Sequence, residues 1–356
     1  MSRDYSAMTT LVTQKLQSSG TVDYTVSEVD NMLEETLKEY SHYRPYVHQV
    51  VFKIESRYGT ASTTSANNLV DSTKGQFLAA DATDEKVVHN TTDNTYAVVL
   101  SMADTATFGL SRDIFAVNEN YNIYNKRCWN KKQINIGDMV DWEKIDSVEY
   151  PVGEKRNWKI IGNEILELNI DTVQDSNAGS TITELPDVDV LVRFIRPHIL
   201  SQLTDWEGKF SATAAAGATT LSGSSLQSAG TIEVGEEFYV ENHKTRYIVA
   251  ATATIASNTV AISFFPGLEA AVAATTWTFT FTKSSLRPND EDIFADLAAA
   301  RLAINKAPKY FNKIAIGGGV VWQNMQSWGE RRLAQTLAKL QSQTPPKVKH
   351  TFSTEY

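Results

Sequence analysis

Hydrophobic positions near the start of the chain recur at steps of three and four residues, which predicts an amphipathic helix between Thr21 and Pro45. Thr25 is a suitable N-cap, and Glu28 follows three residues later, as in a capping box. Pro45 is expected to end this helix. A second helical stretch is expected over about 46–58. The predicted apolar stripe of the first helix consists of Val26, Val29, Leu33, Leu37, Tyr40 and Tyr43.

Through the middle of the chain the apolar period changes to two, which is typical of strands. Short alternating segments separated by Asp, Asn, Gly and Thr predict a compact β module over 56–128. A sheet-like segment follows over 134–197, with a hairpin turn at Gly162-Asn163. Residues 208–283 contain five strand candidates, and their turn spacing suits a small barrel or sandwich.

Helical periodicity returns near the end of the chain. We expect a helix in "EDIFADLAAARLAINK", capped by Asn289 and ended by Ala307-Pro308. A glycine triplet, Gly317–Gly319, should separate it from a last amphipathic helix. The apolar positions of that last helix are Met325, Trp328, Leu333, Leu337 and Leu340. Residues 342–356 contain a Pro-Pro pair and two lysines, and we expect an extended tail.

These patterns predict an α+β fold in which the helices of the two chain ends pack as one helical body, with β-rich modules of barrel or sandwich type inserted between them. A helix with one apolar stripe needs a partner, and the other clearly helical region is at the far end of the chain. The predicted parts are 1–55 (N-terminal helical part), 56–128 (first β module), 129–204 (central sheet), 205–283 (second β module), 284–341 (C-terminal helical part) and 342–356 (tail).

Composition and charge limit the function classes. The chain has 356 residues, 42% hydrophobic and 21% charged, enough for a real core, and its net charge of -9 argues against a protein that grips duplex DNA. One cysteine, Cys128, rules out an internal disulfide and fits a reducing compartment. We expect no secretory signal and no membrane span.

The residues that carry chemistry form no catalytic or metal-binding pattern in the sequence, so we predict no enzyme, no metal and no cofactor. The six histidines lack metal-ligand spacing. Cys128 follows Arg127, which could activate a thiol, but a half-buried structural cysteine at a strand end is the better interpretation. The acids of "NDEDIFAD" could bind a cation, but helix capping is the stronger explanation. "IAIGGGVVW" lacks the spacing of a phosphate loop.

Charge is distributed unevenly between the two helical ends. Residues 21–40 are strongly acidic, whereas the chain from Ser284 onward is basic. One interpretation is that the acidic surface of one subunit binds the basic surface of its neighbour. The alternative is that both charged surfaces face solvent. The candidate interface residues are Arg331, Arg332, Lys339, Lys347, Lys349, Glu34 and Glu35.

The opening segment "SEVDNMLEETLKEYSHYRPYV" resembles the head–tail connector (adaptor or neck) proteins of tailed bacteriophages. Such proteins often begin with a capped acidic helix that ends in a Tyr-Ser-x-x-Arg-Pro-like segment. "IDSVEYPVGEKRNWKIIGNEILEL" and "VDVLVRFIRPHIL" resemble strands of large phage neck proteins, and "IEVGEEFYVENHKTRYIV" resembles a β module common in virion proteins. The chain is longer than compact adaptors, so its β modules would be insertions.

The resemblance implies a structural virion protein, made in the host cytoplasm and placed in the virion neck. Its partners would be the portal protein, the next neck or tail protein, and copies of itself in a ring, twelve being the expected number. Genomic DNA would pass through without specific binding, and family members often dock a C-terminal tail into the portal. A tail-side or capsid-surface decoration protein is the alternative, and a polysaccharide-active enzyme is a third.

Overall fold

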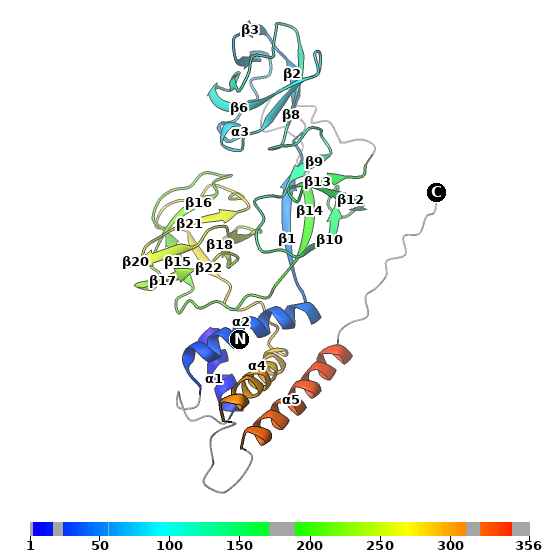
Figure 1. The fold of residues 1–356 in the computed structure, drawn as a ribbon. Coiled ribbons are helices and arrows are strands. Elements are labelled where there is room, and N and C mark those ends of the chain that lie inside the picture. The colour runs from blue at the N-terminus through cyan, green and yellow to red at the C-terminus, as the bar shows by residue number, and fades with distance from the viewer. Residues whose placement is uncertain (1–2, 17–23, 56, 171–188, 311–320, 344–356) are drawn as a thin grey trace.

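The computed structural model describes residues 3–16, 24–55, 57–170, 189–310 and 321–343. The fold is α+β, and its N-terminal and C-terminal helices pack together as predicted, with the β-sheets and a barrel between them in sequence (Figure 1). The predicted glycine break at 317–319 and the tail beyond Gln343 lie outside the described residues.

The helical body contains four α-helices: α1 (Tyr5–Lys15), α2 (Val26–Tyr43), α4 (Glu291–Lys306) and α5 (Val321–Gln343), with a 3-10 turn at Ala307–Tyr310. α4 is the central element, because α1, α2 and α5 all pack against it. The buried core of this body includes Leu33, Tyr40, Phe294, Leu297 and Leu340. Residues more than 250 positions apart in sequence therefore share one apolar core.

The opening helix forms as its sequence predicts. Thr25 Oγ1 accepts a hydrogen bond from the Glu28 N–H, and the Glu28 carboxylate accepts one from the Thr25 N–H, which completes the capping box. The predicted stripe is wrong at Val26, which is 58% exposed. In α5 the prediction of a buried Trp328 is also wrong, since Trp328 is 38% exposed.

Two features of the N-terminal region differ from the prediction. The segment expected to continue as helix is instead strand β1 (Tyr46–Lys53), so the range 1–55 is not wholly helical. Its sequence YVHQVVFK alternates buried and exposed positions and is rich in Val, which favours a strand over a helix. Helix α1, which the periodicity analysis missed, has a threonine-rich sequence with a weak stripe, and it buries Met8 and Val12.

α4 packs closely against α5 at Gly329. A Cβ atom at this position would lie 2.7 Å from Ile304 Cγ1 and 2.9 Å from the Ala300 carbonyl oxygen. α4 also contributes the buried small residues Ala295, Ala298 and Ala299. Small side chains on both helices thus allow a short interhelical distance. The helix begins at Glu291 with Asp290 as its N-cap, one residue later than the predicted cap at Asn289.

The central sheet joins the two halves of the chain. β1 pairs along its whole length with β14 (Asp189–Arg196), and β10 (Lys144–Glu149) and β11 (Lys155–Arg156) complete the order β1-β14-β10-β11. A smaller sheet packs beside it, with β12 (Trp158–Ile161), β13 (Ile165–Leu168) and β9 (Gln133–Asn135) in the order β12-β13-β9. The predicted hairpin turn is confirmed, since Gly162 and Asn163 both have positive φ between β12 and β13.

The first β module is a seven-stranded sheet of order β2-β8-β5-β6-β7-β4-β3 with the short helix α3 (Ala79–Thr83). It lies at the opposite end of the molecule from the helical body (Figure 1). The strands are β2 (Tyr58–Thr60), β3 (Thr63–Ser65), β4 (Asn68–Val70), β5 (Val87–Asn90), β6 (Thr95–Asp104), β7 (Thr107–Leu110) and β8 (Asn120–Tyr124).

A buried ion-pair cluster stands where the chain passes from β1 into the first β module. Arg57 Nη2 lies 2.6 Å from a carboxylate oxygen of Glu55 and 2.6 Å from one of Asp81 on α3. Lys86 Nζ lies 2.6 Å from Glu55 and 3.0 Å from Asp81. The charges of two carboxylates and two cations cancel in this buried site. Removal of either cation would therefore leave a buried negative charge without a partner.

The second β module is a closed six-stranded barrel of order β15-β16-β21-β19-β18-β22, with a two-stranded sheet β17-β20 beside it. Small residues make room in its core, because a Cβ atom at Gly208 would lie 2.3 Å from the Phe279 ring. The sequence predicted five strands here, and the structure has eight: β15 (Glu207–Phe210), β16 (Thr220–Ser224), β17 (Ala229–Ile232), β18 (Glu237–Val240), β19 (Arg246–Val249), β20 (Ala253–Ala256), β21 (Val260–Phe265) and β22 (Thr278–Phe281).

Candidate interaction surfaces

Ion pairs link the acidic α2 to α4 and the 3-10 turn that follows it. Lys306 Nζ lies 2.6 Å from Glu28 Oε2, and Lys309 pairs with the same carboxylate. Arg301 Nη2 lies 2.5 Å from Glu39 Oε1. Some of the acidic and basic side chains that we expected to pair between subunits therefore pair within one chain.

The acidic cluster at the start of α4 binds basic side chains from the other helices. Sequence reasoning assigned these acids to helix capping, but the N-cap Asp290 makes no capping hydrogen bond with its side chain. Because the other helices surround α4, basic side chains from them and from their flanking residues lie beside the acids near its start. The pairs are Arg3–Glu291, Lys15–Asp292, Lys15–Asp296, Arg44–Asp290 and Arg332–Asp296.

The candidate interface residues divide into three groups. Arg332 is engaged inside the chain, with Nη2 2.8 Å from Asp296 Oδ1. Arg331 and Lys339 are exposed on α5, and Glu34 and Glu35 are exposed on α2, so they remain available to a partner. Lys347 and Lys349 lie outside the described residues.

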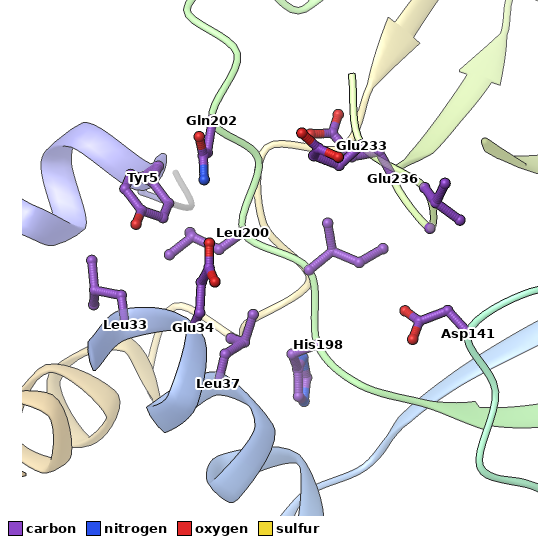
Figure 2. Close-up of a pocket in the computed structure, with 13 residues that line it drawn as sticks. Tyr5, Leu33, Glu34, Leu37, Asp141, His198, Leu200, Gln202, Glu233 and Glu236 are labelled. Carbon is purple, nitrogen blue, oxygen red and sulfur yellow. The ribbon is translucent and has the colours of Figure 1, made fainter. Parts of the chain in front are cut away.

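A cavity of about 220 Å³, here called the junction cavity, lies where the helical body meets the barrel and the central sheet. α2 contributes Leu33, Glu34 and Leu37, the segment after β14 contributes residues 198–200 and Gln202, and the turn before β18 contributes residues 233–236. Figure 2 shows these side chains around a shared space, with Tyr5 of α1 and Asp141 at its sides.

Two neighbouring glutamates at the start of β18 have opposite environments. Glu237 is fully buried, and its carboxylate lies 2.8 Å from His48 Nδ1 and 2.6 Å from Arg246 Nη1, while Tyr46 donates a hydrogen bond at 2.7 Å. Burial opposes the charge on Glu237, but the hydrogen bond and charge of His48, with Tyr46 and Arg246, lower its pKa to about 2. This ionised glutamate ties β1 of the central sheet to the barrel.

Glu236 is 7% exposed and has no cation beside it among the described residues. The Ser201 hydroxyl donates to its carboxylate at 3.3 Å. Burial, with a smaller contribution from the nearby charge of Glu233, raises the pKa of Glu236 to about 7. Sequence reasoning missed both glutamates, although two consecutive acids at the start of an apolar strand are a signal, because one of them must point inward.

His198 and Cys128 take structural positions. His198 Nε2 lies 2.8 Å from the Arg44 carbonyl oxygen, and burial lowers its pKa, which keeps the ring neutral. Cys128 is fully buried, and burial raises the pKa of its thiol to about 12, as expected for a structural cysteine. Within the described ranges, no three acidic, histidine or cysteine side chains converge as metal ligands, and no helix is both long and apolar enough to cross a bilayer.

Comparisons with known proteins give no further identification. No family model matches the chain, and neither the curated proteins nor the solved structures contain a match to it.

Proposed function

We propose that this protein is a structural virion subunit of a tailed bacteriophage, a head–tail connector that forms a ring beneath the portal and joins the capsid to the tail. The observation that carries the proposal is the helical body. The opening segment that resembles connectors, "SEVDNMLEETLKEYSHYRPYV", contains most of α2, and α2 packs on α4 from the C-terminal part of the chain. The β modules are then insertions into this body, as the length of the chain suggested.

Opposite charges on two exposed surfaces of the helical body support a ring of identical subunits. Arg331 and Lys339 project from α5, whereas Glu34 and Glu35 project from α2. A contact between such unlike surfaces is heterologous, and it generates a closed ring when the rotation between subunits closes. The portal protein and the next neck or tail protein would bind the two faces of the ring, and twelve copies remain the expected number.

The genomic DNA is expected to pass through the ring without specific binding. Each retained Lys or Arg contact to phosphate would add salt-dependent affinity and slow the passage. A net charge of -9 and an acidic α2 are compatible with a lining that repels the duplex. We therefore expect no measurable shift of duplex DNA by the isolated protein near physiological salt.

Light scattering and cryo-microscopy of the protein, alone and with its portal, test the proposal. A ring, or monomers that form one on the portal, is the expected result. A variant that lacks residues 342–356 should fold but attach to its partners less well, because a basic, proline-containing tail is suited to order only on binding. Chains that remain monomeric with portal present, or that bind duplex DNA with micromolar affinity, would contradict the proposal.

The alternative, a tail-side or capsid-surface decoration protein, is favoured by the first β module. This module stands at the end of the molecule away from the helices, and it exposes Leu100 (63%) and Val117 (47%) (Figure 1). Single exposed apolar residues are common, but a binding module at a free end would use them. Retention of the protein on capsids or tails after deletion of residues 58–124, with portal binding intact, would exclude this alternative.

A further inference from the structure

Four carboxylates line the junction cavity, and its lining includes no lysine or arginine. Glu34, Glu233 and Glu236 form no ion pair with any described residue, and Asp141 Oδ2 lies 3.6 Å from Arg196 Nη2. Glu34, Asp141 and Glu233 are exposed, so solvent weakens their mutual repulsion, whereas Glu236 is buried beside them. The cavity is thus electronegative and open to a cation from outside the described chain.

The burial of Glu236 distinguishes this cavity from an ordinary acidic surface. Elsewhere in the described part of the chain, a buried carboxylate has either a cation or several strong donors. The paired ones are Glu55, Asp81, Glu149, Glu237, Asp290, Glu291 and Asp296, and Asp71 accepts hydrogen bonds from two backbone N–H groups and Tyr121. Glu236 has only the 3.3 Å contact from Ser201 and the backbone of Glu233. A buried carboxylate without a cation is costly, so an incoming cation would be strongly favoured.

The remaining walls suit the side chain of a lysine rather than a bare ion. Leu33, Leu37 and Leu200 face the cavity beside the carboxylates (Figure 2). A lysine buries its aliphatic stem against such walls and places the ammonium group among the acids. The described residues offer no convergent set of metal ligands here, which favours an organic cation.

We propose that the junction cavity receives a lysine from the C-terminal tail, residues 344–356, of a second copy of the chain. The tail sequence TPPKVKH presents Lys347 and Lys349 in a short, proline-led segment, and its charge complements that of the cavity. Fully extended, a segment of this length reaches roughly 45 Å. This length is the upper limit for the distance between the end of α5 in one copy and the cavity that its tail would occupy.

The position of α5 favours a tail from a neighbour over the chain's own tail. α5 packs on α4, contributes nothing to the cavity lining, and lies on the other side of α4 from the barrel (Figure 1). A head-to-tail arrangement of copies would bring the tail of one subunit toward the cavity of the next. This choice of a second copy rests on the proposed ring, and it assigns the tail to the neighbouring subunit instead of the portal.

Crosslinking between two full-length variants tests the proposal. One chain carries Gln202→Cys, an exposed residue of the cavity lining, and the other, marked by a size tag, carries His350→Cys, which leaves both lysines in place. Cys128 is buried and should not react. A short bis-maleimide is expected to join the two chains. Glu236→Gln in the first chain, or Lys347→Glu with Lys349→Glu in the second, should lower the yield about tenfold or more, because one half of a buried charge pair is lost.

Controls define the results that would overturn the proposal. Gln49→Cys, an exposed glutamine on the central sheet outside the cavity, should give little product. Equal yields of crosslinked product from Gln49→Cys and Gln202→Cys would reject the cavity as the site. A yield that Glu236→Gln leaves unchanged would reject it as well. A chain with both cysteines that crosslinks only within itself at high protein concentration would reject the second copy. Light scattering on the same samples separates the two proposals: rings without product contradict the tail docking alone, and product without rings contradicts the connector alone.

Discussion

The adjacent residues Glu236 and Glu237 should make opposite contributions to stability as pH changes, and single glutamine variants would reveal both. Glu236→Gln removes a buried charge that has no cation, whereas Glu237→Gln removes one that has His48, Tyr46 and Arg246 around it. Glutamine preserves the shape of the side chain in each case. The two positions are adjacent, with Glu236 in the turn before β18 and Glu237 at the first position of the strand, so each serves as the control for the other.

For Glu236, the folded pKa of about 7 lies above the ordinary value of 4.5. The folded state therefore binds the proton more tightly than the unfolded state, and stability falls as pH rises from about 4.5 through 7. The difference corresponds to about 3 kcal/mol at pH 8. Glu236→Gln should thus stabilise the barrel by up to about 3 kcal/mol at pH 8, and the gain should vanish near pH 4.

For Glu237, the folded pKa of about 2 lies below the ordinary value, so the sign reverses. Its contribution to stability is complete above about pH 4.5 and is lost as pH falls toward 2. Glu237→Gln should therefore cost about 3 kcal/mol at neutral pH, and less as the pH decreases.

Hydrogen exchange measured by mass spectrometry on peptides that cover β18 and β19 would give the opening free energy across this pH range. Peptides from the seven-stranded sheet of the first β module serve as an internal reference, because neither glutamate contacts it. The reasoning is refuted if Glu236→Gln destabilises the barrel at pH 8, or if both variants change stability in the same direction there.

Three further predictions concern the helical body. Leu33→Asp and Leu297→Asp each place a charge in the same apolar core, so each should lower the free energy of unfolding by more than about 3 kcal/mol. Hydrogen-exchange protection should then fall in α1, α2 and α4 together, with the barrel unaffected. Loss of protection confined to one helix would contradict joint packing. Gly329→Val should separate α4 from α5 and lower the thermal unfolding temperature, at a cost of about 1–3 kcal/mol, whereas unchanged stability would contradict the close contact. Arg331→Glu with Lys339→Glu should leave circular dichroism unchanged but weaken ring or portal assembly in light scattering, and full assembly by this variant would remove α5 from the interface.

Local sequence determined the elements whose signals are complete within a short window. The capping box at Thr25 and Glu28, the period of α2 and the Gly162-Asn163 turn all depend on neighbours a few residues away, so the sequence alone predicted them. The joint packing of the chain ends was also predictable, because each end carried an apolar stripe that could not be buried locally.

Tertiary structure decided which charges act inside the chain and which remain outside. Arg332 and Arg331 are adjacent and chemically identical, but the position of α4 gives Asp296 to the first and solvent to the second. Likewise, Glu236 and Glu237 differ only in which neighbours the sheet and the barrel bring to them. Most of these partners are distant in sequence, for example 36 positions between Arg332 and Asp296 and 189 between His48 and Glu237, and no local pattern encodes them. Strand β1 differs from these cases, because its Val-rich sequence favours a strand locally and β14 then pairs with it along its whole length.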